Sequence, residues 1–392
     1  MQSILAALIA VGIPVVFLVI IYTLDLYASR TFALVLVCAF WGALGGLGLS
    51  FLFNTYVAVP FITRMGWSLL LLFVVFAPIA EEILKSLSLF YIARRPEFTY
   101  FVDGAIYGFA AGIGFSITEN FLYMYQGASS LGVMLVRSFS TCLMHGTASA
   151  LVGAAVGRFR FQKRSGRGLA MVGGWLAAII LHAIFNSIAR NQRLPQGLVV
   201  PLLVALGLAG VGLIAFFINL GLREQRNWFA ETLDRQVGVS GAEVRAAQGY
   251  ASIDEKLKPL AQQFPKKAEA IEALVLYQAQ MGIKMKVQRQ VSDPRIKEQL
   301  SGEIAELQKE MERLRKKIGG YAMIFVRTVF PLGEMDLWAD VAQRAPASDG
   351  PVDQARWMDI GKRAEASQKK APMETGIFKQ ARVKTPPRQE EE

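Results

Sequence analysis

The sequence predicts an all-α membrane protein, with about seven transmembrane helices followed by a mainly helical cytoplasmic tail. Hydrophobic residues make up 53% of the 392 residues and charged residues only 19%, whereas charged residues account for roughly 25% of an ordinary soluble domain. The charges are also unevenly divided, because residues 1–221 hold 13 Lys or Arg and 6 Asp or Glu, and the rest of the chain holds 29 and 25. Residues 1–221 are therefore predicted to form a membrane domain, and residues 222–392 to lie outside the bilayer.

Seven apolar windows are long enough to cross a bilayer, which takes about 20 mostly apolar residues. They lie at residues 4–23, 32–56, 67–92, 102–125, 135–157, 168–189 and 197–221. The first window has no basic flank before it and no convincing cleavage site. It therefore predicts a retained span rather than a secretion signal.

Lys and Arg in the short loops predict which face of the membrane is cytoplasmic. The loops on one side carry eight of them: Arg30, Arg94, Arg95, Arg158, Arg160, Lys163, Arg164 and Arg167. The loops on the other side carry only Arg64, Arg190 and Arg193. This asymmetry predicts an external amino terminus and a cytoplasmic carboxyl tail. The basic loop between two spans indicates topology and contact with lipid headgroups, and no nucleic-acid partner is expected.

The third window carries three ionisable residues in the run "EEILK". Glu81 and Glu82 precede Lys85 by four and three residues, so a helix places the ammonium near either carboxylate. Adjacent residues on a helix point roughly 100° apart, so the second carboxylate can face a cavity. Ionisable groups at membrane depth are costly and usually functional. A purely structural ion pair is the alternative, and it accounts for only one of the two glutamates.

The fourth and later windows supply further polar groups. Small residues recur at every fourth position of the fourth window, which lets another helix approach closely: Gly104, Gly108, Gly112 and Ser116. The same helix then presents Glu119 and Asn120, with Phe115 one turn before Glu119. The two histidines of the chain, His145 and His182, both lie in later predicted spans. We therefore expect these groups to share one site.

Such groups suit the hydrolysis of an amide bond. A desolvated glutamate is a usable general base for a water molecule. Neutral histidine and the amide of Asn186, one turn after His182, can donate hydrogen bonds to the oxyanion of a tetrahedral intermediate. Alternatively, His145, His182 and one carboxylate, for which Glu119 is a candidate, could bind Zn²⁺ and leave a fourth position for water. The residues leave both mechanisms open.

The motifs "EEILK" and "FSITEN", followed by one His in each of two later spans, resemble those of the PrsW family of intramembrane proteases. This family is related to the CAAX-type prenyl endopeptidases. The resemblance covers roughly residues 1–220 and implies an intramembrane endopeptidase of a bacterial inner membrane that cleaves membrane-anchored proteins such as anti-sigma factors. The site residues that it implies are Glu81, Glu82, Glu119, His145 and His182, supported by Lys85, Phe115, Asn120 and Asn186.

Two features limit what the resemblance implies. The prenyl-protease relatives place His, not Glu, four residues after the Phe, so a role for Glu119 does not transfer from them. His182 with Asn186 does resemble their HxxxN motif, which serves the oxyanion. Family members are called metalloproteases, whereas the prenyl-protease relatives resemble glutamate-dependent enzymes without a metal. An enzyme that binds zinc and an enzyme without a cofactor therefore both remain open as alternatives.

Other classes fit the sequence less well. The chain has no HExxH motif, and the aspartates of the membrane part, Asp25 and Asp103, lie near span ends, which disfavours an aspartyl protease. A multi-pass transporter or proton-relay protein would also bury Glu, Lys and His, but no inverted repeat of the motifs is present. A membrane scaffold acting through its cytoplasmic tail is the third alternative.

The tail resembles no family and predicts a docking or regulatory module without chemistry. Within residues 222–363, Asp293 caps a helix that begins at Pro294 and ends at Gly319. Apolar residues of this helix step by three and four, as in a coiled coil or a helical hairpin: Ile304, Leu307, Met311, Leu314 and Ile318. We expect a hairpin with the preceding segment, near 265–318, and self-association into a homo-oligomer is the alternative. Residues 364–392 are predicted to be disordered.

Overall fold

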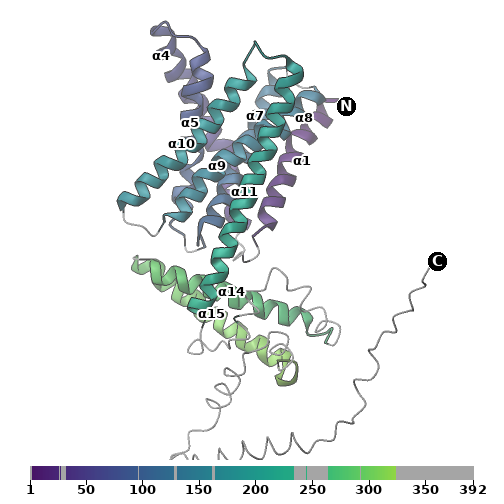
Figure 1. Ribbon diagram of the computed structural model, residues 1–392, viewed down its shortest axis with the longest axis vertical. Helices are drawn as coiled ribbons and strands as arrows, with labels where there is room; N and C mark the ends of the chain where they lie inside the picture. Colours follow the sequence, from purple (N-terminus) through teal and green to yellow (C-terminus); the bar gives the residue numbers. More distant parts are fainter. Residues whose placement is uncertain are drawn as a thin grey trace, which may run out of the picture. The chain divides into compact units, whose positions relative to one another are not determined.

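The computed structural model describes residues 2–25, 27, 32–95, 97–127, 130–160, 164–233, 244, 264–291 and 293–323. Every regular element in these ranges is a helix, so the all-α class is confirmed for the part of the chain that the structure describes (Figure 1). The predicted disordered tail, 364–392, lies outside the described residues.

Six helices in the described ranges are long and apolar enough to cross a membrane, and the chain is a multi-pass membrane protein. They are α1 (Gln2–Thr23), a rod over Phe32–Arg64, α7 (Phe101–Tyr125), α8 and α9 together (Leu131–Phe139 and Thr141–Arg158), α10 (Arg164–Ala189) and α11 (Gln196–Thr232). The rod comprises α2 (Phe32–Phe40), α3 (Leu47–Phe53) and α4 (Val59–Arg64), joined by π-helical turns. Six of the seven predicted windows therefore correspond to these helices.

The remaining window, 67–92, is helical but interrupted, so the expected count of seven spans stays a prediction. A π-helical turn, Leu72–Phe76, leads into α5 (Ala77–Lys85), and α6 (Leu87–Ile92) follows after a break at Ser86. The Ser86 hydroxyl donates to the carbonyl oxygen of Ile83 at 2.7 Å. The indole of Trp41 donates to the Leu84 carbonyl at 3.0 Å, and that of Trp175 to the Ser86 hydroxyl at 2.9 Å. Side chains thus satisfy polar groups at a break inside the bundle, as an apolar environment requires.

Helix α7 is the central helix of the membrane part, and its glycines set how closely its neighbours approach. A Cβ at Gly104 would lie 2.1 Å from the carbonyl oxygen of Gly153, and one at Gly108 would lie 2.2 Å from that of Ser149. The backbones of α7 and α9 are therefore in direct contact, which the predicted small-residue ridge requires. On the opposite face, a Cβ at Gly114 would lie 1.9 Å from the carbonyl oxygen of Ala39 on α2.

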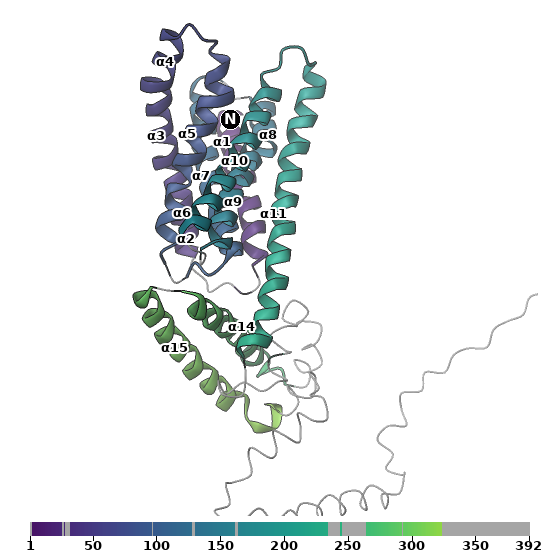
Figure 2. The ribbon, with the colours of Figure 1, turned by 60° about the vertical axis from the view of Figure 1, so that its left-hand side comes forward.

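The rod of α2 to α4 runs beside the interrupted helix. Figure 2 shows α3 and α5 side by side, and residues of the two elements are in contact. π-Helical turns are rare and frequently accompany functional sites. Their occurrence in the rod and again before α5 therefore indicates a functional site in this part of the bundle. It is the part that carries Glu81 and Glu82.

Two further helices, α14 (Ala268–Gln290) and α15 (Pro294–Ile318), form a helical hairpin. Asp293 caps α15 by accepting a hydrogen bond from the amide of Arg295 at 3.0 Å. A partly buried ion pair joins the two helices, because Lys284 Nζ lies 2.6 Å from Glu303 Oε2. Helix α14 also contacts the end of α11, where Thr232 donates to the Gly282 carbonyl at 3.1 Å. Helix α11 thus continues past residue 221, the predicted end of the membrane domain.

Candidate active site

The ionisable side chains of the four motif segments meet at one place inside the helical bundle. They come from α5, α7, α9 and α10: Glu81, Glu82, Lys85, Glu119, His145 and His182. The close approach of α7 and α9 is a direct cause, because a Cβ at Gly112 would lie 2.1 Å from the carbonyl oxygen of His145. The same glycine ridge that packs the helices therefore places Glu119 beside His145.

Glu82 and Lys85 form a fully buried ion pair beneath the two histidines. Lys85 Nζ lies 2.7 Å from Glu82 Oε1, and both side chains are 0% exposed. The same ammonium lies 2.8 Å from His145 Nδ1, and Glu82 Oε1 lies 2.8 Å from His182 Nδ1. Phe115 covers the pair, since its ring centroid lies 4.4 Å from Lys85 Nζ. The Lys85 ammonium thus contacts the His145 ring, and the Glu82 carboxylate contacts the His182 ring.

These contacts fix the protons of the two imidazole rings. His182 Nδ1 faces a carboxylate and donates to it, so the lone pair of His182 is on Nε2. His145 Nδ1 faces the Lys85 ammonium and accepts from it, so the proton of a neutral His145 is on Nε2. The two rings are edge-to-face, with centroids 4.7 Å apart. One histidine therefore offers an acceptor and the other a donor at its Nε2.

Glu81 occupies a different environment from Glu82. It lines a cavity of about 590 Å³ whose walls also include Glu119, His145, His182 and Asn186. Within the described ranges, Oε2 of Glu81 and Oε2 of Glu82 are both buried without a hydrogen bond, but Glu81 lines the cavity and Glu82 does not. Glu81 Oε2 lies 3.9 Å from His182 Nε2, too far for a direct hydrogen bond. A water molecule within hydrogen-bond distance of both atoms would fit between them.

Glu119 is held by a residue that the sequence reasoning did not identify. Arg137, on α8, donates to Glu119 Oε2 at 2.7 Å and to Asn120 Oδ1 at 2.8 Å. Its guanidinium lies 3.8 Å from the centroid of the Tyr123 ring. Glu119 Oε2 is also 3.5 Å from His145 Nε2. A lone Arg inside the window 135–157 was the available signal, because a cation at membrane depth requires a partner.

Asn186, proposed from its spacing to His182, lines the same cavity. Its amide nitrogen donates to the carbonyl oxygen of Phe73 at 2.8 Å, within the π-helical turn that precedes α5. One amide hydrogen is therefore used by the backbone, and the other is available to the cavity.

Three of these residues present atoms that could hold a metal ion. One ligand atom from each of Glu81, His145 and His182 lies within 4.8 Å of the others. Glu119, the carboxylate that the sequence reasoning considered for this role, is bound to Arg137 instead. A carboxylate with two imidazoles is a donor set that catalytic zinc sites use.

One comparison with known proteins gives a match, and it is to a protein family. No curated protein and no solved structure matches the chain. Residues 30–220, which contain every residue of the cluster, match the family described as PrsW family intramembrane metalloprotease. The match supports a membrane protease that acts within the lipid bilayer on membrane substrates, rather than a transporter or a scaffold. The membrane part of this chain, residues 30–220, is therefore similar to the PrsW family of intramembrane proteases.

Proposed function

We propose that the chain is an endopeptidase that cleaves membrane-anchored proteins with a water molecule activated at Glu81. The observation that carries this proposal is the buried Glu81 Oε2, which faces the cavity and receives no hydrogen bond from the described part of the chain. A buried carboxylate without a partner is costly, so the site favours a bound water, proton or cation at this oxygen.

The attacking water would lie between Glu81 Oε2 and His182 Nε2. Both atoms are hydrogen-bond acceptors in this arrangement, and they are 3.9 Å apart. A water molecule that donates one hydrogen to each has its oxygen lone pairs free for the peptide carbonyl. Glu81 would then accept the proton as the water attacks.

The oxyanion that forms would be stabilised by donors on the same cavity wall. His145 Nε2 carries a proton, because Lys85 occupies the Nδ1 side of the ring. The second amide hydrogen of Asn186 faces the cavity that these residues share. In other enzymes, removing one such donor raises the activation free energy by about 3–4 kcal/mol.

Glu82, Lys85 and Arg137 are positioning residues in this proposal, since they do not line up with the reacting water. Glu82 fixes the tautomer of His182, and Lys85 fixes that of His145. Arg137 neutralises Glu119 and keeps it next to His145.

A divalent metal ion also fits the cluster. Glu81 Oε2 and His182 Nε2 are free of protein donors, whereas His145 would have to give up the proton on Nε2 before that atom could bind the ion. Glu81, His145 and His182 would be its ligands. A metal ion bound there would polarise the substrate carbonyl and lower the pKa of its water. In that form Glu81 serves as a ligand instead of as the base, and the reaction is the same.

The tail and its substrate partners extend the proposal. We infer from the basic loops that the hairpin of α14 and α15 faces the cytoplasm of a bacterial inner membrane. A single-span regulatory protein of the anti-sigma type is the substrate class that the resemblance to the family implies.

Cleavage of a membrane-anchored reporter by the purified protein in nanodiscs tests the proposal. Glu81→Gln should abolish cleavage without changing thermal unfolding, because the amide is nearly isosteric but cannot accept the proton. Glu224→Gln, which alters an exposed ion pair with Arg158, is the matched control and should cleave normally. Metal content of the same samples separates the two forms: zinc that is lost in His182→Ala identifies the metal enzyme. Full activity of Glu81→Gln would refute the assignment.

A further inference from the structure

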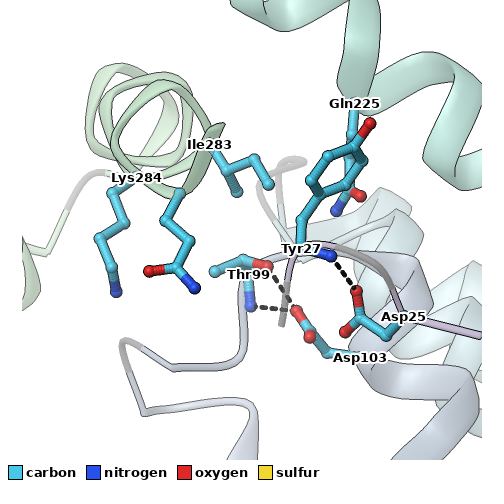
Figure 3. A pocket seen from close by; sticks show the side chains of 8 residues that line it. Asp25, Tyr27, Thr99, Asp103, Gln225, Ile283 and Lys284 are labelled. Carbon is cyan, nitrogen blue, oxygen red and sulfur yellow. Dashed lines mark hydrogen bonds between the residues drawn. The ribbon is translucent and has the colours of Figure 1, made fainter. Parts of the chain in front are cut away.

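A second, much smaller pocket is lined by other residues than the candidate active site (Figure 3). Its volume is about 10 Å³, close to what one water molecule or one ion occupies. Its walls come from the chain after α1, the start of α7, α11 and α14, represented by Asp25, Asp103, Gln225 and Gln280. Elements of the membrane bundle and of the hairpin thus enclose one oxygen-lined space.

One oxygen of each of the two carboxylates accepts hydrogen bonds from backbone amides. Asp103 Oδ2 accepts from the amides of Thr99 and Tyr100, at 2.7 and 3.0 Å, and caps α7. Asp25 Oδ1 accepts from the amide of Tyr27 at 3.1 Å. Both carboxylates line the pocket, and these hydrogen bonds to the backbone fix where they lie.

Gln225 supplies a third acceptor and an independent indication of a ligand. Gln225 is 3% exposed, and its Oε1 atom is buried. In the part of the chain that the structure describes, no group donates a hydrogen bond to this oxygen. Figure 3 shows the Gln225 side chain directed toward Thr99 and Asp25. A buried amide oxygen without a donor costs about 1–3 kcal/mol, which a bound cation or water would offset.

The pocket is lined by two carboxylates and one ammonium. The ammonium is that of Lys284, and it is paired with Glu303 at 2.6 Å. Two arginines act on residues of the pocket wall, Arg160 on Asp103 and Arg226 on Tyr27. The carboxylates of Asp25 and Asp103 are the acidic groups that line the pocket itself.

From this geometry we propose that Asp25, Asp103 and Gln225 bind one hard divalent cation of the Ca²⁺ or Mg²⁺ class. Such ions take carboxylate and amide oxygens as ligands and complete their shell with water. The bound cation would hold α11 against the end of α1 and the start of α7. Because α7 also carries Phe115, Glu119 and Asn120, the same ion would connect α11 to the helix that forms one wall of the candidate active site.

Isothermal titration of the full-length, chelator-treated protein with Ca²⁺, and separately with Mg²⁺, tests the proposal. We expect one ion per chain, with an affinity that Asp25→Asn and Gln225→Leu each lower by about tenfold or more, since ligand charge and number set affinity. Glu231→Gln is the matched control, because it removes an exposed carboxylate, paired with Lys286, at the same contact between α11 and α14. His182→Ala should bind normally, which excludes the candidate active site as the source.

Thermal unfolding without added cation checks that the variants fold. Asp25→Asn should unfold at the same temperature as the parent protein or higher, because the substitution relieves repulsion between the two carboxylates. Absence of a titration signal with both ions would overturn the proposal. Binding that is unchanged in Asp25→Asn and Gln225→Leu, or stabilisation by monovalent cations alone, would do the same.

Discussion

Replacing Lys85 with Met tests the buried ion pair beneath the histidines. Lys85 Nζ and Glu82 Oε1 are 2.7 Å apart, and neither side chain is exposed. Removing the ammonium leaves the Glu82 carboxylate buried without its counter-ion, which costs about 3–5 kcal/mol in comparable cases. Met fills a similar volume, so a cavity contributes little to the change. The variant should therefore lose a large part of its stability to unfolding.

A double-mutant cycle separates the pair from the packing. Glu82→Gln together with Lys85→Met removes both charges and keeps a carbonyl oxygen that can accept from His182 Nδ1. The double variant should recover at least about 2 kcal/mol of the loss, because the uncompensated charge is gone. Equilibrium unfolding in mixed detergent micelles measures each corner of the cycle.

The control for this cycle is an exposed pair of the same type and spacing. Arg313 and Glu310 are also three residues apart on a helix, at 2.8 Å, but their side chains are 69% and 45% exposed. Arg313→Met should cost less than about 1 kcal/mol. If Lys85→Met also costs so little, or if the double variant is no more stable than the single one, the ion pair does not hold the site together.

The remaining predictions concern helix packing and the cavity wall. Gly112→Ala should destabilise the protein by about 1–3 kcal/mol and lower cleavage, because the new Cβ would lie 2.1 Å from the carbonyl oxygen of His145. Gly212→Ala, where a Cβ meets nothing within 4 Å, should leave cleavage unchanged and stabilise the helix slightly; equal effects in thermal unfolding would contradict the packing argument. Asn186→Ala should lower turnover about 100-fold in a cleavage assay if its free amide hydrogen serves the oxyanion, and a loss of stability with normal turnover would leave it only the contact with Phe73.

The all-helical class and six of the membrane helices could be predicted from the sequence because both depend on local properties. A run of about 20 apolar residues has few alternatives to a helix in lipid. The candidate site residues were predicted for the same reason, since a Glu or His within such a run is conspicuous without any knowledge of its neighbours. The glycine ridge of α7 could also be predicted from its four-residue spacing, and in the structure it packs against α9.

The features that could not be predicted from the sequence depend on contacts between residues that are distant in the chain. The break at Ser86 is stabilised by indoles from Trp41 and Trp175, which are 43 residues from Leu84 and 89 residues from Ser86 in the chain, respectively. Hydropathy reports only the composition of the window 67–92, so it predicts an unbroken span there. Arg137 was missed in the same way, because nothing near it in the sequence identifies Glu119 as its partner.

The different roles proposed for Glu81 and Glu82 follow from the numbers of carboxylates and cations in the cluster. The cluster contains three carboxylates, those of Glu81, Glu82 and Glu119, and the two cations Lys85 and Arg137. Lys85 pairs with Glu82 and Arg137 pairs with Glu119, each at 2.7 Å. Glu81 is left beside the neutral side of His182, with a free oxygen in the cavity. A purely structural network would have no reason to retain this third carboxylate, because a buried charge without a partner destabilises the fold. Its retention at the cavity wall is therefore the strongest physical argument that the cluster binds and activates something that enters from the cavity.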